Sequence, residues 1–118
     1  MEIFKEFSFE AAHLLPNVPA DHKCRRLHGH SFHVAIYVEG IVGDESGWVM
    51  DFADLKVVFK PILEQLDHYY LNDIEGLENP TSENIAWWIW RRLKPALPQL
   101  TKIQIRETCT SGCVYTGD

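Results

Sequence analysis

Two histidines flank a glycine in His28-Gly29-His30, and their residue type and spacing are the strongest indication of a chemical function in this sequence. Side chains alternate along an extended strand, so positions 28 and 30 point to the same side and both imidazoles can reach one metal ion. Gly29 lets another backbone approach closely. His13 ends an earlier strand-like segment and could supply a third nitrogen. Three protein nitrogens that leave one coordination position open are typical of a catalytic zinc site.

Zinc is favoured over iron or copper because neither a carboxylate triad nor an axial methionine accompanies these histidines. His33 would face the opposite side of the same strand from His28 and His30, so we exclude it from the site. His22 lies in a loop and receives no role. The alternative is that each histidine is an ordinary hydrogen-bonded residue near the core.

Cys24 stands four residues before His28, beside the basic residues Lys23, Arg25 and Arg26. Cationic surroundings favour the thiolate, which is the reactive form of cysteine. A basic cluster in an acidic chain also suggests an anionic substrate. Three interpretations stay open: a reactive thiol, a fourth zinc ligand that would close the site, or a free cysteine in a solvated loop.

Asp67-His68 follows a predicted helix and could take part in a proton relay. Adjacent residues seldom hydrogen-bond each other directly, so we do not expect a simple Asp–His couple. The alternative is that Asp67 is only a loop residue at the end of the helix.

Glu107 shares a predicted strand face with Ile103 and Ile105 and is therefore expected to be buried. A buried carboxylate needs a hydrogen-bond donor. It could accept two parallel N–H bonds from the edge of a guanidine-like heterocycle. The alternative is an ion pair with a cation of the protein.

The pattern of apolar residues predicts an α+β fold in which strands and helices are segregated. We expect the helices on one face of an antiparallel sheet, and the bare face to meet sister chains. The predicted elements are strands over 3–13, 28–39 and 48–50, helices over 52–66 and 82–93, a strand over 102–109, and a short final pairing at 114–115. Pro61 is expected to kink the first helix.

The chain has 118 residues and a formal net charge of −6, which fits a single domain over residues 1–118. The negative charge argues against a general nucleic-acid binder or a membrane-surface binder. We see no signal peptide and no transmembrane span, since there is neither a basic leader nor a long apolar run. The three cysteines do not form a disulfide framework, and Cys109 and Cys113 are expected to be packing residues. A reducing, cytoplasmic location is the natural expectation.

Several motifs together resemble the 6-pyruvoyl-tetrahydropterin synthase family, and more closely its bacterial branch that forms 6-carboxy-tetrahydropterin for queuosine biosynthesis. The spacing of Cys24 from the histidines favours that branch. The resemblance spans nearly the whole chain and rests on Phe7-Ser8-Phe9-Glu10-Ala11-Ala12-His13, Cys24-Arg25-Arg26-Leu27-His28-Gly29-His30, Trp48-Val49-Met50-Asp51-Phe52, Leu66-Asp67-His68, Asn79-Pro80-Thr81-Ser82-Glu83-Asn84 and Glu107-Thr108-Cys109.

The resemblance implies the tunnelling fold, with four antiparallel strands and two helices on one face. Subunits would form a trimeric barrel, and two trimers a homohexamer with active sites at subunit interfaces. It also implies site roles: zinc on His13, His28 and His30; catalysis by Cys24, Asp67 and His68; and pterin binding by Glu107, Thr81 and Ser82.

The implied reaction converts 7,8-dihydroneopterin triphosphate to 6-carboxy-5,6,7,8-tetrahydropterin with loss of acetaldehyde and triphosphate. Two alternatives remain. One is the pyruvoyl-forming triphosphate lyase, which keeps the carbon chain. The other is a non-catalytic zinc-binding assembly module, in which Cys24 would ligate the metal.

Overall fold

Two long strands run along the middle of the sheet. The computed structural model describes residues 1–118, and in it β1 (Glu2–His13) pairs antiparallel with β2 (His28–Glu39) along its whole length. On its other edge β2 pairs antiparallel with β4 (Leu100–Arg106), and β4 with β5 (Gly112–Tyr115). A two-residue strand, β3 (Tyr69–Tyr70), pairs parallel with the outer edge of β1. The expected sheet of four antiparallel strands is confirmed, with β3 added at its edge.

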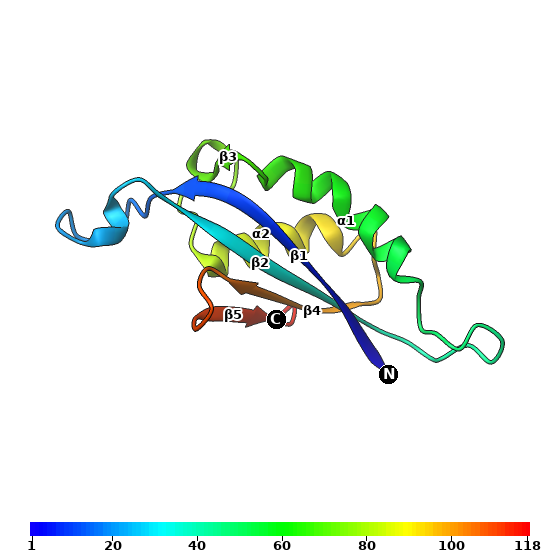
Figure 1. The fold of residues 1–118 in the computed structure, drawn as a ribbon. Helices are drawn as coiled ribbons and strands as arrows, with labels where there is room; N and C mark the ends of the chain where they lie inside the picture. Colours follow the sequence, from blue (N-terminus) through cyan, green and yellow to red (C-terminus); the bar gives the residue numbers. More distant parts are fainter.

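Both helices lie on the same face of this sheet (Figure 1). Helix α1 (Phe52–Leu66) begins after Asp51, whose carboxylate accepts the Ala53 amide at 2.9 Å. Helix α2 (Ser82–Leu93) begins after Thr81, whose hydroxyl accepts the Asn84 amide at 3.1 Å. Such side-chain caps satisfy amide groups that the first turn of a helix leaves free. Two short 3₁₀ turns lie in connecting segments: η1 (Lys23–Arg25) between β1 and β2, and η2 (Leu71–Asp73) between β3 and α2.

The hydrophobic core lies between the sheet and the helices. Phe9 of β1 and Phe32 of β2 stack with ring centroids 4.9 Å apart, and both are fully buried. Full burial of a large apolar side chain contributes about 1.5–3 kcal/mol. The helices supply the opposite wall of the core with Leu55, Phe59, Ile62, Leu66, Ile85, Trp88, Ile89 and Leu93.

The other face of the sheet carries no helix (Figure 1). Its side chains are mostly polar and form ion pairs between β1 and β4 across the intervening β2, such as Lys102 with Glu2 at 3.4 Å and Arg106 with Glu6 at 3.9 Å. Phe4 of β1 and Val114 of β5 are large apolar exceptions and are about half exposed. The expected bare sheet face is therefore present.

Three expectations about the elements were wrong. Residues 48–50 form no strand, because β2 already pairs with β1 on one edge and with β4 on the other and offers no free edge to a hairpin partner. Strand β4 ends at Arg106 rather than at residue 109, so Glu107 lies in the turn that follows. Cys109, in the same turn, is exposed and is not a packing residue.

Candidate active site

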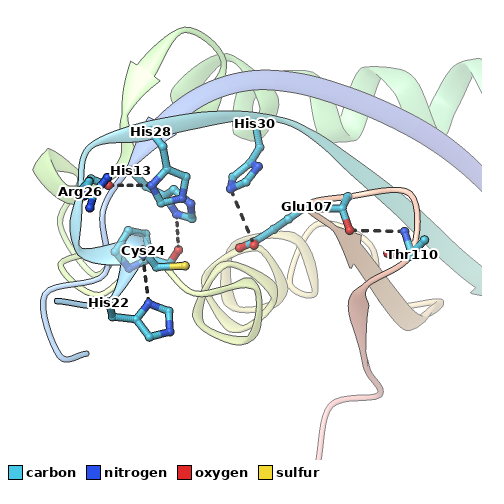
Figure 2. Close-up of polar contacts among 10 residues, drawn as sticks. His13, His22, Cys24, Arg26, His28, His30, Glu107 and Thr110 are labelled. Carbon is cyan, nitrogen blue, oxygen red and sulfur yellow. Dashed lines mark hydrogen bonds and ion pairs between the residues drawn. The ribbon is translucent and has the colours of Figure 1, made fainter. Parts of the chain in front are cut away.

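The antiparallel register of β1 and β2 brings the three histidines together. His13 lies directly opposite His28, and Ala11 lies opposite His30. All three imidazoles point to the helix-bearing face at the end of the sheet, and one ligand atom from each lies within 4.8 Å of the others. Figure 2 shows the rings gathered there. The expected convergence of three imidazoles is thus found.

Backbone carbonyl groups orient two of the rings. The Nδ1 atom of His13 donates to the Pro80 carbonyl at 2.9 Å, and Nδ1 of His28 donates to the Arg26 carbonyl at 2.7 Å (Figure 2). With the proton on Nδ1, each Nε2 keeps its lone pair. A backbone carbonyl that accepts from one ring nitrogen fixes the tautomer that a metal-ligating histidine needs.

His13 Nε2 is the one buried side-chain nitrogen or oxygen of the protein that has no hydrogen-bond partner. His13 is 1% exposed, and burial lowers the pKa of its imidazole. A lowered pKa keeps the ring neutral, which is the form that binds metal. An unpartnered, neutral nitrogen beside two similar ones fits a zinc ion, which takes imidazole ligands in tetrahedral sites.

Glu107 lies beside this group. Its Oε2 is 3.9 Å from Nε2 of His30, and its side chain is only 27% exposed although it is outside the strand (Figure 2). The expectation of a buried carboxylate on the strand face of Ile103 and Ile105 was wrong, because β4 ends at Arg106 and Glu107 is partly exposed in the turn that follows.

Cys24 lies at the same end of the sheet. The loop between β1 and β2 folds back on itself, so that the Leu15 amide donates to the Cys24 carbonyl at 2.8 Å. The thiol is free and partly buried, and it is not among the ligand atoms that converge with the imidazoles. Of the basic neighbours, Arg25 is engaged with the Val18 carbonyl at 3.1 Å.

Thr81 caps α2, and Ser82 is its first residue. The start of the helix lies next to the histidines, because the preceding residue, Pro80, accepts the hydrogen bond from His13. The Thr81 hydroxyl is used as the helix cap. Both residues therefore lie close to the imidazole group, at the end of a helix where backbone amides favour negative charge.

Asp67 and His68 form a direct couple, contrary to expectation. Nδ1 of His68 lies 2.9 Å from Oδ2 of Asp67. The contact is possible because His68 adopts a left-handed backbone conformation, with φ of 65°, which turns its ring back toward the preceding side chain. No other non-glycine residue of the protein has a positive φ.

Hydrogen bonds attach Asp67 and His68 to the outer edge of β1, and none joins them to the three converging histidines. The Glu10 amide donates to Asp67 Oδ1 at 2.9 Å, and the His68 amide donates to the Glu10 carbonyl at 2.6 Å. His68 lines an open hollow of about 550 Å³ together with Glu10, Ser31, Tyr69 and Tyr70. No hydrogen bond or ion pair joins Cys24 to Asp67 or His68 within the chain.

Several groups of the site could not be predicted from the types of residue in the sequence. The Pro80 and Arg26 carbonyls belong to the backbone, and only the folded loops reveal them. The role of Glu10 in holding Asp67 is equally a backbone contact. His22, in contrast, was visible as a histidine two residues before Cys24, and its ring accepts the Cys24 amide.

Comparison with known proteins agrees with this architecture. Residues 2–118 match the family described as 6-pyruvoyl tetrahydropterin synthase. A 6-carboxy-5,6,7,8-tetrahydropterin synthase of Synechocystis is 53% identical over 96% of this chain and 91% of its own length. A dihydroneopterin monophosphate aldolase of Pyrococcus furiosus is 41% identical over 82% of this chain and 78% of its own.

A solved structure shows the same fold. The 6-pyruvoyl tetrahydropterin synthase of Caenorhabditis elegans superposes with a TM-score of 0.91 and 30% identity, covering 100% of this chain and 96% of that one. The match extends over the strands that carry the histidines and over both helices. This chain therefore belongs to the 6-pyruvoyl tetrahydropterin synthase family.

Proposed function

We propose that this protein is a zinc-dependent carbon–carbon lyase. It converts 7,8-dihydroneopterin triphosphate to 6-carboxy-5,6,7,8-tetrahydropterin, acetaldehyde and triphosphate, as a step of queuosine biosynthesis. The observation that carries the proposal is the convergence of three imidazoles, one with an unpartnered buried nitrogen, beside the carboxylate of Glu107. The choice of reaction is supported by the 53% identity to the Synechocystis synthase, against 30% to the pyruvoyl-forming enzyme of C. elegans.

His13, His28 and His30 would hold the zinc ion. When bound, zinc supplies Lewis acidity to the hydroxyl groups of the substrate side chain. Glu107 would anchor the pterin by accepting hydrogen bonds from its 2-amino and ring N–H groups, and Thr81 and Ser82 would assist it.

Cys24 is proposed to move a proton at the substrate side-chain carbon, with His68 as its partner. Oδ2 of Asp67 lies 2.9 Å from Nδ1 of His68, and a carboxylate there would favour the proton on Nδ1 and leave the Nε2 lone pair free to accept another proton. The imidazole can therefore act as a base, and Asp67 stabilises the cation that forms.

Cys24 and His68 are not joined within one subunit, which supports a site at a subunit interface. We propose a homohexamer, a dimer of trimers, in which the bare sheet faces line a barrel and one subunit's Asp67 and His68 meet another's Cys24. No helix of the protein has the length and apolarity required to cross a bilayer. A cytoplasmic location is part of the same proposal.

The test is to incubate zinc-loaded protein with 7,8-dihydroneopterin triphosphate and identify the products by mass. Release of acetaldehyde with 6-carboxy-tetrahydropterin supports the proposal. A pterin that retains a dicarbonyl side chain would identify a pyruvoyl-forming enzyme. The similarity to the P. furiosus aldolase makes the monophosphate a useful second substrate. Absence of any turnover on both would leave the zinc-binding assembly module as the better description.

A further inference from the structure

We propose that His22 is a positioning residue for Cys24. This inference rests on the proposed function, because it assigns His22 to the presentation of the thiol that carries out the chemistry. The carrying observation is one contact: the backbone amide of Cys24 donates to Nδ1 of His22 at 3.0 Å (Figure 2).

The direction of this hydrogen bond fixes the state of the ring. A backbone N–H can only donate, so the Nδ1 atom of His22 must be the unprotonated acceptor. The ring thereby caps η1, the short turn over Lys23–Arg25 that contains the cysteine. Side chains that accept an amide two residues ahead hold a turn in one conformation.

Both backbone polar groups of Cys24 are thus held from outside the residue. The amide is held by the His22 ring, and the carbonyl accepts the Leu15 amide at 2.8 Å. His22 is itself anchored, since its amide donates to the Pro19 carbonyl at 2.9 Å and its carbonyl accepts the Arg25 amide at 3.0 Å. The Leu15 contact joins the turn to the segment that follows β1, and the His22 contact holds the other backbone polar group of Cys24.

The remaining features of His22 agree with positioning rather than with folding. The residue is exposed and does not belong to the hydrophobic core. Its ring forms no ion pair and lies outside the converging imidazoles. In Figure 2 the Cys24 sulfur points to the side on which the Glu107 carboxylate is drawn, and the His22 ring lies below the turn.

Side-chain length supplies a matched pair of variants. In histidine, Nδ1 is three bonds from Cα, and Oδ1 of asparagine is also three bonds away. Oε1 of glutamine is four bonds away, as is Nε2 of histidine. His22→Asn therefore keeps an acceptor where the Cys24 amide needs it, while His22→Gln keeps an amide group but moves the acceptor by one bond.

The experiment compares turnover and amide exchange in the zinc-loaded protein and its variants. We expect His22→Gln and His22→Ala to lower kcat about tenfold with KM nearly unchanged, because small displacements of a reacting group cost rate rather than affinity. His22→Asn should stay within about twofold of the original, and Asp21→Ala, which alters the adjacent exposed residue, should have no effect. Hydrogen exchange of the Cys24 amide should be about fivefold faster in the Gln and Ala variants, as expected for the loss of one modest hydrogen bond, and normal in the Asn variant.

Three results would overturn the inference: Asn and Gln variants with the same turnover, an Ala variant with normal kcat, or amide exchange that is identical in all forms. Failure of the proposed function looks different. Unmodified protein would then release no acetaldehyde, while the exchange of the Cys24 amide would still report whether His22 holds the turn.

Discussion

His68 contacts the side chain of the residue directly before it, with its Nδ1 atom 2.9 Å from Oδ2 of Asp67. The left-handed backbone at His68, with φ of 65°, makes this contact between neighbours possible. A non-glycine residue in this region costs about 1–3 kcal/mol and persists only where the surroundings enforce it. Here the surroundings are two hydrogen bonds to Glu10 of β1. Backbone strain at His68 indicates a functional reason for the orientation of its imidazole.

We expect Asp67→Asn to lower kcat by about 10²–10⁴ while the protein stays folded. An asparagine at this position can still accept the Glu10 amide through its Oδ1, but its NH₂ group would face Nδ1 of His68. The ring must then carry its proton on Nε2 and can no longer act as a base. Steady-state kinetics with a thermal melt of each protein would check this. A kcat within tenfold of the original would show that the couple has no catalytic role.

Asp67 should also contribute an acid-sensitive part of the stability. The Glu10 amide, and after it His68, lowers the pKa of Asp67 below its ordinary value of 3.8. Because the folded protein binds this proton less readily than the unfolded chain, the contribution is complete above pH 3.8 and disappears as the pH falls through the lower, folded-state pKa. Unfolding free energies of the original and Asp67→Asn should therefore differ at about pH 5 and converge toward about pH 2. Asp21→Asn, which removes a carboxylate without a hydrogen-bond partner, serves as the control and should show no such convergence.

The two parts of the site differed in how far the sequence could predict them. Alternation along β1 and β2 is a local property, so it placed His13, His28 and His30 on one face, and the antiparallel register brought them together. The contact between Asp67 and His68 depends on the backbone dihedral angle of His68, which the hydrogen bonds to Glu10 enforce. No residue type in the sequence predicts that angle. The missing strand at 48–50 has the same kind of cause. Its pattern suits a strand, but both edges of β2 are already paired, one with β1 and the other with β4, which is distant in the chain.

Bound zinc should stabilise the folded protein, and this stabilisation should require His28 as a ligand. An ion that binds only the folded state at a thousand times its Kd adds about 4 kcal/mol. We expect chelator-treated protein to melt at a lower temperature than zinc-loaded protein, and His28→Ala to abolish that difference. His33→Ala is the matched control, because His33 lies on the same strand but faces the helix-free side. An undiminished zinc effect in His28→Ala would exclude the proposed ligand set.

Cys24→Ala should separate catalysis from metal binding. The thiol is outside the group of converging nitrogen atoms, so the variant is expected to bind zinc with the same stoichiometry while losing turnover by at least about 10². Metal analysis and product assays on the same preparation would measure both. Loss of zinc together with activity would instead make Cys24 a ligand and favour the structural zinc module.

Glu107 is expected to act on substrate affinity. Its carboxylate is only partly exposed, and the nearest cationic candidate in the protein is His30, 3.9 Å away, so its oxygens remain available for a ligand. Hydrogen bonds to a charged group contribute about 1.5–3 kcal/mol, so Glu107→Gln should raise KM about tenfold to a hundredfold and change the zinc content little. Glu64→Gln, at an exposed position of α1 paired with Lys60, should leave KM unchanged. If Glu107→Gln instead released zinc at normal KM for the remaining active enzyme, the carboxylate would belong to the metal site and the pterin anchor would have to be sought among Thr81 and Ser82.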